Sequence, residues 1–394
     1  MKKIYLDYAA TTPVDPRVLK EMLPYYKDIF GNPSSLHEFG QGAKRAIAAA
    51  REKVARLISA SPEEIIFTSG GTEADNYAIK GSYYALGMSD AQIITSSIEH
   101  HAVSEPCKFL ATQGAKIIFL PVDENGLVNP EEVRKNLTPK TILVSIMHAN
   151  NEIGTIQPIE EIAKIVAEFR KAQGTPYPYF HTDAVQTAGH LPINVSEIGA
   201  DLLSMSAHKL YGPKGVGALY VKKGIKLMTF MHGGEQEQNR RASTENVAGI
   251  VGFGKAAELA SQEFEKEVKR LTELRDYLIA QILTKIKKVR LNGHPTKRLP
   301  NNVNVSIEGI EGEAMLISLD LVGIACSTGS ACSSSVLEPS HVLLALGLAP
   351  EVAHGSLRFA LGKYTQKADL DFTVKNLISI VERLRNISPL KIAS

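Results

Sequence analysis

The chain has 394 residues, of which 44% are hydrophobic and 22% charged, a globular composition that excludes the disordered and fibrous classes. At about 150 residues per domain, this length indicates two or three domains. The 44 Lys and Arg against 42 Asp and Glu leave a net charge of +2, which argues against direct nucleic-acid binding because a phosphate-binding surface normally carries a basic excess.

No segment is typical of a membrane or secreted protein. The best apolar run, from Thr141 to Met147, falls far short of the roughly 18 residues that span a bilayer. Residues 1–13 contain no apolar core of a secretion signal, so we expect a cytoplasmic protein without membrane contact. The three cysteines, Cys107, Cys326 and Cys332, are an odd set that cannot form a disulfide framework, and at least one thiol must be free.

Short β-branched runs alternate with helical stretches from about Glu64 to Val221. Several runs are apolar at consecutive positions, as expected of strands covered on both faces, and residues 159–171 between them carry apolar side chains on one helical face. The alternation predicts a mostly parallel sheet covered by helices, with the strand order left open. The expected strands are 65–67, 92–95, 116–120, 141–147, 179–182, 202–205 and 216–221.

Beyond Gly254 the pattern changes. Residues 258–288 read as one long charged helix with apolar positions at three- and four-residue steps, a connector into a second domain. That domain is expected to contain strands at 300–306 and 323–325 and helices at 340–346 and 368–385. The basic cluster at 285–290 is interpreted as a solvated helix end rather than a nucleic-acid patch, because Lys and Arg favour the last helical turn.

Residues 68–75, TSGGTEAD, follow an expected strand and open an expected helix. Glycines there let a ligand approach the backbone, and the first helical N–H groups attract anions. The segment lacks the Lys of a P-loop and the spacing of a dinucleotide fingerprint, so a single phosphate suits it better than a nucleotide. The alternative is a capping box formed by Thr72 and Asp75.

Two further strand ends carry chemical groups. Lys209 follows a buried strand and precedes a Gly-rich turn, where burial would make its amine a nucleophile or base, although it could also simply emerge into solvent. Asp183 ends another strand, at the edge where open α/β sheets bind ligands. It could be a metal ligand, a helix cap or the partner of a protonated heterocycle; the metal reading is disfavoured because His100, His101 and His181 lack ligand spacing.

The three features together favour pyridoxal phosphate as the cofactor. Its phosphate needs N–H donors, its ring nitrogen needs an acid, and its aldehyde needs an amine for a Schiff base. Five motifs then make the chain resemble the NifS/IscS-type cysteine desulfurases from Ile4 to about Leu390. They are YLDYAATTP at 5–13, FGNPSS at 30–35, NNEIG at 150–154, SAHK at 206–209 and GSAC at 329–332.

The resemblance implies a fold-type I enzyme of the class V aminotransferase kind, α/β, with a seven-stranded mostly parallel sheet and a smaller α+β domain. Residues 1–15 would form an arm on the small domain, 16–257 the large cofactor domain and 258–394 the small domain. The implied enzyme is a homodimeric sulfurtransferase. It converts L-cysteine to L-alanine and an enzyme persulfide for an acceptor, such as an iron–sulfur scaffold or a tRNA-thiolation protein.

The resemblance also implies roles for individual residues. Lys209 would hold the cofactor and act as the base at the substrate Cα, Asp183 would pair with the ring nitrogen, and Gln186 would contact the phenolic oxygen. His100 would stack on the ring and counts with Lys209 and Cys332 as catalytic. The remaining residues would bind the phosphate (Gly71, Thr72, Ser206, His208 and, from the partner subunit, Thr244) or the substrate (Asn32, Asn151, Arg358), with Asn151 also orienting the cofactor.

Cys332 lies in a small, polar segment that suits a mobile loop better than a core. There its thiolate could attack the sulfur of the bound substrate and carry the persulfide outward. The alternative is a buried cysteine packed as a small hydrophobe. Cys107 is interpreted as structural, at a helix start, and a chelating pair of Cys326 with Cys332 is disfavoured.

Some residues depart from the family pattern. Glu235, Asn239 and Ser243 stand where many relatives have glycine, and this weakens the assignment of Thr244. A selenocysteine lyase, another enzyme of the same fold, or a non-catalytic sulfur carrier are the rival functions. The GSAC motif argues against a selenocysteine lyase. The set of Lys209, Asp183 and His100 argues against a non-catalytic carrier. The identity of the sulfur acceptor is left open.

Overall fold

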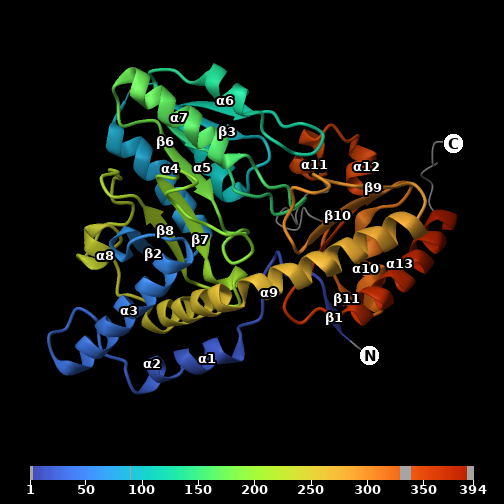
Figure 1. The fold of residues 1–394 in the computed structure, drawn as a ribbon, viewed down its shortest axis with the longest axis horizontal. Coiled ribbons are helices and arrows are strands. Elements are labelled where there is room, and N and C mark those ends of the chain that lie inside the picture. The colour runs from blue at the N-terminus through green and yellow to red at the C-terminus, as the bar shows by residue number, and fades with distance from the viewer. Residues whose placement is uncertain (1–2, 89, 329–338, 388–394) are drawn as a thin grey trace.

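The computed structural model describes residues 3–88, 90–328 and 339–387. A larger body built around one sheet and a smaller body lie side by side, and the long helix α9 (Val247–Lys285) runs from one to the other (Figure 1). No helix in these ranges is both long and apolar enough to cross a bilayer.

The large sheet has seven strands, and all seven expected strands are found in it. β7, β6, β5, β3 and β4 pair in parallel, whereas β8 runs antiparallel to both of its neighbours, β2 and β7. All strands except β8 therefore share one direction, which confirms the prediction of a mostly parallel sheet. The order is β2 (Ile65–Thr68), β8 (Gly217–Val221), β7 (Leu202–Ser206), β6 (Tyr179–Asp183), β5 (Thr141–Ser145), β3 (Gln92–Ser96), β4 (Lys116–Leu120).

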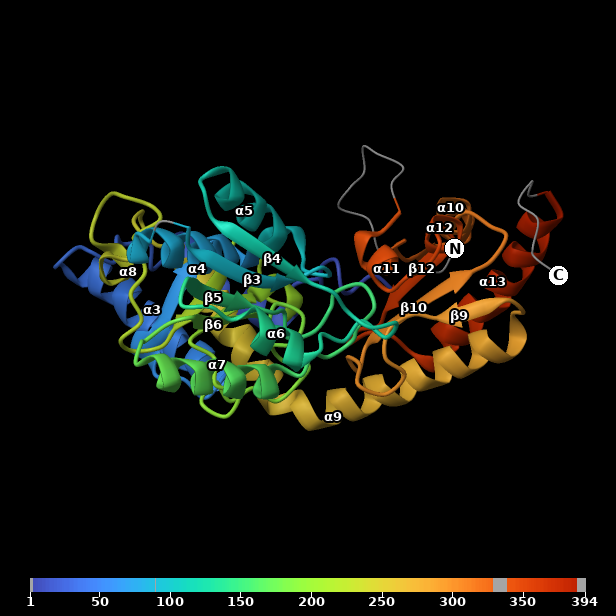
Figure 2. The same cartoon turned by 90° about the horizontal axis from the view of Figure 1, so that it is seen from above.

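Helices cover both faces of this sheet. α4 (Gly71–Leu86) and α5 (His101–Thr112) lie on one side, and α7 (Ile159–Gln173) and α9 lie on the other (Figure 2). Successive strand residues point to opposite faces, so Leu202 packs in a core with Tyr77 of α4, whereas Leu203 packs in a core with Phe253 of α9. Burial on both faces explains why these strands read as continuous apolar runs.

The first half of α9 corrects an expectation. The helix begins at Val247 and not at Glu258, with the Asn246 side chain accepting from the Gly249 N–H at 3.0 Å. Its first turns are apolar because they are buried in the large core. The charged pattern that predicted the helix starts only where α9 leaves that core.

The smaller body has its own apolar core, to which the second half of α9 contributes Leu271 and Leu278. Its antiparallel sheet has the order β12 (Ser356–Ala360), β10 (Asn302–Ile307), β9 (Val289–Leu291) and is covered by α10 (Gly312–Leu321) and α13 (Lys367–Ile387). The N-terminal strand β1 (Ile4–Tyr5) pairs with β11 (Ile324–Ala325). The expected strands at 300–306 and 323–325 correspond to β10 and β11, whereas β9 and β12 had not been expected.

The remaining elements are short, with one exception. They are α1 (Pro16–Met22), α2 (Pro24–Lys27), α3 (Glu38–Leu57), α6 (Pro130–Asn136), α8 (Gln236–Asn239), α11 (His341–Ala345) and α12 (Pro350–His354), with 3-10 turns η1 (Pro62–Glu64) and η2 (Ala207–Lys209). Of these, α3 is the longest; it lies against the first half of α9. η2 follows β7 directly and carries the lysine singled out in the sequence.

Candidate functional site

The carboxyl ends of the parallel strands bring most of the predicted site residues to one edge of the large sheet. Asp183 is the last residue of β6, Ser206 is the last of β7, and Gly71 opens α4 just after β2. This edge is where open α/β sheets place their ligands. The topology therefore brings together residues that lie more than a hundred positions apart in the chain.

Lys209 lies in η2 against the N-terminal segment. Its Nζ donates to the carbonyl oxygens of Ala9 at 2.5 Å and Ala10 at 2.8 Å. The Gln186 side chain donates to the same Ala9 oxygen at 3.1 Å. The lysine amine and the Gln186 amide are thus neighbours, and the lysine is half-buried rather than emerging into solvent.

Asp183 is a buried carboxyl at the end of β6. Burial raises its pKa to about 6, an effect reduced by the hydrogen bond from the Val185 N–H and by the charge of Lys209. The Val185 bond is 2.8 Å long. A carboxylate held in this way can hold the proton of a ring nitrogen, because the opposite charge stabilises both groups away from water.

The start of α4 has the properties of a phosphate site. Its N-cap residue is Gly70, without a side-chain cap, so first-turn N–H groups are available to an anion. The alternative capping box was wrong, because Asp75 is buried under the helix. Beside this turn, the buried Ser206 Oγ has no hydrogen-bond partner among the described residues. A Cβ on Gly71 would lie 2.6 Å from Val185 Cγ2, so a larger residue there would require Val185 to shift.

Two histidines at this edge are neutral. His100 is the N-cap of α5, its Nδ1 accepting from the Ala102 N–H at 3.0 Å, and burial together with the charge of Lys209 lowers its pKa to about 4. The pKa of His208 is likewise lowered by burial to about 4, and its Nδ1 lies 3.1 Å from Thr11 Oγ1. A neutral imidazole ring suits stacking on an aromatic cofactor.

Arg358 connects the smaller body to this edge. From β12, its Nη1 donates to the Asn151 carbonyl at 3.1 Å and its Nη2 to Asp7 Oδ1 at 2.8 Å. The residue is 4% exposed, and its buried Nε has no hydrogen-bond partner within the described ranges. A guanidinium in this setting can bind a carboxylate in a planar, bidentate way.

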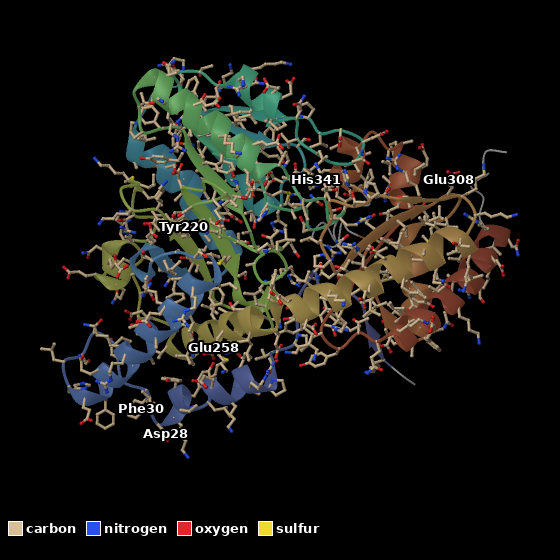
Figure 3. All side chains as sticks on the ribbon, in the orientation of Figure 1. Asp28, Phe30, Tyr220, Glu258, Glu308 and His341 are labelled. Atoms are coloured by element: carbon tan, nitrogen blue, oxygen red, sulfur yellow. The ribbon has the colours of Figure 1, made fainter. Side chains whose placement is uncertain are left out.

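Two predicted residues lie apart from the others. Asn32 is exposed, and its side chain accepts from the Ser34 N–H of its own loop. That loop includes Asp28 and Phe30, which lie at one end of the molecule, away from His341 (Figure 3). Thr244 is also exposed and lines a hollow with Ser69 beside the start of α4. The hydrogen bonds of Asn32 are those of its own loop, from the Ser34 and Ser35 N–H groups.

The departures from glycine fall into two kinds. Asn239 and Ser243 have φ of 63° and 102°, in the left-handed region that favours glycine. Glu235 has φ −84°, which any residue adopts, so a side chain there carries no backbone cost.

Replacing Ser243 with glycine is expected to stabilise the protein. A non-glycine residue at φ of 102° stores about 1–3 kcal/mol of strain, and glycine loses about 0.5–1 kcal/mol of conformational entropy. We expect the free energy of unfolding to rise by about 1 kcal/mol in denaturant titration. Ser196→Gly, at an exposed loop position without a positive φ, is the control and should not stabilise. A loss of stability in Ser243→Gly would contradict this reading.

An ion pair that the sequence did not indicate holds the segment that precedes Ser243. The two guanidinium nitrogens of Arg51 bind Glu237 at 2.7 and 2.6 Å. Glu237 also accepts from the Phe67 N–H at 2.9 Å, a donor on the outer edge of the sheet's terminal strand β2. The pair fastens residues 236–239 to the sheet; Arg51 and Glu237 are 186 positions apart, so no local pattern could have predicted it.

The described cysteines are both shielded. Cys107 is fully buried in the middle of α5, and not at a helix start as expected, and burial raises its pKa to about 12. Burial also raises the pKa of Cys326 to about 12, with Asp7 adding to the effect. Neither forms thiolate near neutral pH. Cys332 lies outside the described residues.

No group of three or more His, Cys, Asp or Glu side chains with metal-binding geometry occurs within the part of the chain that the structure describes. The polar groups at this edge combine hydroxyl and amine donors with one buried carboxyl acceptor, a set suited to an anionic, aromatic ligand. Four residues fit the three groups of pyridoxal phosphate. Ser206 and Gly71 suit its phosphate, Asp183 suits its ring nitrogen, and Lys209 suits its aldehyde.

Comparison with known proteins gives consistent matches. Residues 4–372 match the family model described as Aminotransferase class-V. "Cysteine desulfurase IscS" of Dictyoglomus turgidum is 58% identical over 390 residues, covering 99% of this chain and 97% of that protein; the protein of that name from Methanosarcina thermophila is 54% identical over 389 residues, covering 99% and 94%. A solved "NIFS-LIKE PROTEIN" superposes with a TM-score of 0.90 at 39% identity, covering 97% and 100%. "SspA in complex with cysteine" has a TM-score of 0.81 at 36% identity, covering 93% and 100%.

Proposed function

The chain belongs to the aminotransferase class-V family and is a cysteine desulfurase that depends on pyridoxal phosphate, and we propose how its residues divide this reaction among themselves. The observation that carries the assignment is the meeting of Lys209, Asp183 and the unpartnered Ser206 Oγ at one sheet edge. When bound, the cofactor supplies an aldehyde and an electron-withdrawing ring.

In the proposed site, five residues act on the ring. Lys209 would hold the aldehyde through its amine and then move the proton at the substrate Cα. Asp183 would keep the ring nitrogen protonated, and Gln186 would donate to the phenolic oxygen. His100 would stack on the ring, and Asn151 would orient the cofactor with the substrate. The neutral state of His100 supports its proposed place on the ring, since a cation there would repel the protonated ring.

The phosphate is proposed to bind the first-turn N–H groups of α4 at Gly71 and Thr72, together with Ser206 and His208. A phosphate oxygen would supply the partner that Ser206 Oγ lacks. Thr244 would add a contact from the partner subunit.

The sulfur is proposed to pass to Cys332. In this step the thiolate of Cys332 attacks the substrate sulfur, so that a new S–S bond forms while the C–S bond breaks. The electron pair stays on the substrate carbon, which takes up a proton and becomes the methyl group of L-alanine. Support comes from the other two cysteines, whose thiols have pKa values raised to about 12.

A homodimer is also proposed. Large apolar side chains of the N-terminal region are solvent-exposed in one chain: Tyr26 is 65% exposed, Phe30 67%, Leu36 92% and Phe39 59%. The rings of Phe30 and Phe39 lie 5.7 Å apart between centroids, and grouped exposed apolar side chains are typical of a protein–protein interface. A second copy seated there would bring Asn32 and Thr244 into a complete site.

Two apolar cores support the proposed division into an N-terminal arm (1–15), a large domain (16–257) and a small domain (258–394). Ile4 and Leu6 pack in the smaller core, and Phe253 packs in the larger. We further propose that the protein works in the cytoplasm and that its persulfide is passed to a protein acceptor of iron–sulfur assembly or tRNA thiolation.

Replacing Arg358 with lysine is expected to raise the KM for L-cysteine about 10- to 100-fold, because one charge-assisted bidentate contact is worth roughly 1.5–3 kcal/mol. The affinity for pyridoxal phosphate should be unchanged, since Arg358 is assigned to the substrate alone. Steady-state kinetics and cofactor titration measure the two values. Asp7→Asn, which removes a carboxylate that Arg358 contacts, is the control and should raise KM less. An unchanged KM in Arg358→Lys would contradict the assignment.

The reaction itself is tested by measuring alanine and sulfide, with a thiol reductant present, from L-cysteine, L-selenocysteine and L-alanine in parallel. A desulfurase gives equal amounts of alanine and sulfide from L-cysteine. Turnover of L-selenocysteine alone would indicate the rival selenocysteine lyase, and no turnover of any substrate would indicate a sulfur carrier.

A further inference from the structure

A row of polar side chains crosses the sheet on the face under α4. Ser145 of β5 pairs in register with His181 of β6, and Asp183 of β6 pairs with Ser204 of β7. Residues two apart on a strand share a face, so all four lie beneath α4. All four are buried, and α4 adds Asp75 to the row.

His181 occupies the centre of the row and is neutral. Its Nδ1 lies 2.8 Å from Ser145 Oγ and its Nε2 lies 3.1 Å from Ser204 Oγ. Asp75 Oδ1 lies 3.5 Å from the same Nε2. Burial lowers the pKa of His181 to about 3, so the ring does not supply a positive charge to balance a carboxylate at Asp75.

Fewer hydrogen bonds and positive charges stabilise an anion at Asp75 than at Asp183. It is 1% exposed, and its Oδ1 is buried without a hydrogen-bond partner among the described residues. Burial raises its pKa well above the usual value and the nearby Asp183 raises it further, against a smaller effect of Ser204. Asp183 receives the Val185 N–H and the charge of Lys209.

Two neighbouring buried carboxyls do not both ionise, because the like charges repel in a medium that screens them poorly. The remaining acid that faces them is Glu99, whose pKa is raised by burial to about 8 despite hydrogen bonds from Ser96 and Met147. At neutral pH Glu99 is therefore mostly uncharged as well. One negative charge is left in the row, and the contacts place it on Asp183.

We propose that Asp75 is a positioning residue for Asp183: it stays protonated throughout the working pH range and leaves Asp183 as the single anion available to the ring nitrogen of the cofactor. This inference rests on the proposed function, in which Asp183 pairs with the protonated ring nitrogen. A single carboxylate then matches a single pyridinium charge. A second anion would instead raise the proton affinity of Asp183 and leave excess charge in the buried row.

The test compares Asp75→Asn with Asp183→Asn in the holoenzyme. Infrared spectra of protein labelled with ¹³C-aspartate separate the carbonyl band of a protonated aspartic acid from those of unlabelled glutamic acids such as Glu99. The visible band of the bound cofactor is titrated with pH, and the affinity for pyridoxal phosphate is measured by titrating the apoprotein.

We expect a labelled acid band in wild type that is lost in Asp75→Asn and kept in Asp183→Asn. The amide of Asp75→Asn mimics the neutral acid, so cofactor affinity should stay within about 3-fold of wild type, with an unchanged titration midpoint; Asp183→Asn should change both.

A missing acid band in wild type, or its persistence in Asp75→Asn, overturns the proposal, as does a shifted midpoint in Asp75→Asn. If Asp75→Asn does not fold, loss of the band in Asp183→Asn overturns it. A wild type that takes up no cofactor would instead contradict the proposed function, and the infrared band would still report the proton on Asp75.

Discussion

Lys209→Ala is expected to give a folded, colourless protein that releases no sulfide from L-cysteine. In the proposed site the amine of Lys209 both binds the cofactor aldehyde and moves the proton at the substrate Cα, so the variant is expected to lose two functions at once. Removing a nucleophile of this kind typically lowers kcat by about 10⁴-fold or more. The measurements are the visible absorption spectrum, the sulfide assay and a thermal melt of the apoprotein.

The structure predicts that this loss does not come from unfolding. The Lys209 amine donates to Ala9 and Ala10 from a half-buried position, and such hydrogen bonds contribute about 1 kcal/mol each to stability. Lys214→Ala, at an exposed lysine of the following turn, is the matched control and should remain yellow and active. A Lys209→Ala protein that is still yellow after dialysis and still turns over would refute the assignment.

Cys332→Ser is expected to bind the cofactor normally and yet lose sulfide release, by about 10³-fold or more. A serine hydroxyl is a far weaker nucleophile than a thiolate, so the substrate binds but its sulfur has no acceptor on the enzyme. Spectra and cofactor content should match wild type.

The matched control for this variant is Cys326→Ser. Cys326 lies six positions earlier, and its shielded thiol has a pKa raised to about 12, so its replacement should leave turnover within about 3-fold of wild type. Equal losses in both variants would mean that the two cysteines work as a pair, and full activity of Cys332→Ser would exclude Cys332 from the reaction.

The fold could be predicted because its signals are local. Most strands of the large sheet are short runs buried on both faces, such as the TILVS of β5, whereas the edge strand β4 is partly exposed. Each run can be recognised without knowledge of its neighbours. Lys209, Asp183 and the turn before Gly71 stood out because a strand end or a glycine pair marks them. Parallel topology then brings strand ends to the same edge.

The features missed depend on distant contacts. The α9 start at Val247 is hidden because its first turns pack into the large core and carry no charged face. The ion pair of Arg51 with Glu237 joins residues 186 positions apart. The contact of Asp75 with His181 joins residues 106 positions apart. Thr72 and Asp75 have the spacing of a capping box. In the structure the N-cap is Gly70 and the Asp75 side chain is buried in the core, a difference that tertiary packing determines.

The most direct measurement is the mass of the holoenzyme after a single exposure to L-cysteine without reductant or acceptor, together with the alanine released. We predict about one alanine per subunit and one added sulfur atom, located on the peptide that contains Cys332, because the thiolate is consumed once and nothing removes the persulfide. Alanine release without added sulfur on Cys332, or sulfur found instead on Cys107 or Cys326, would contradict the account.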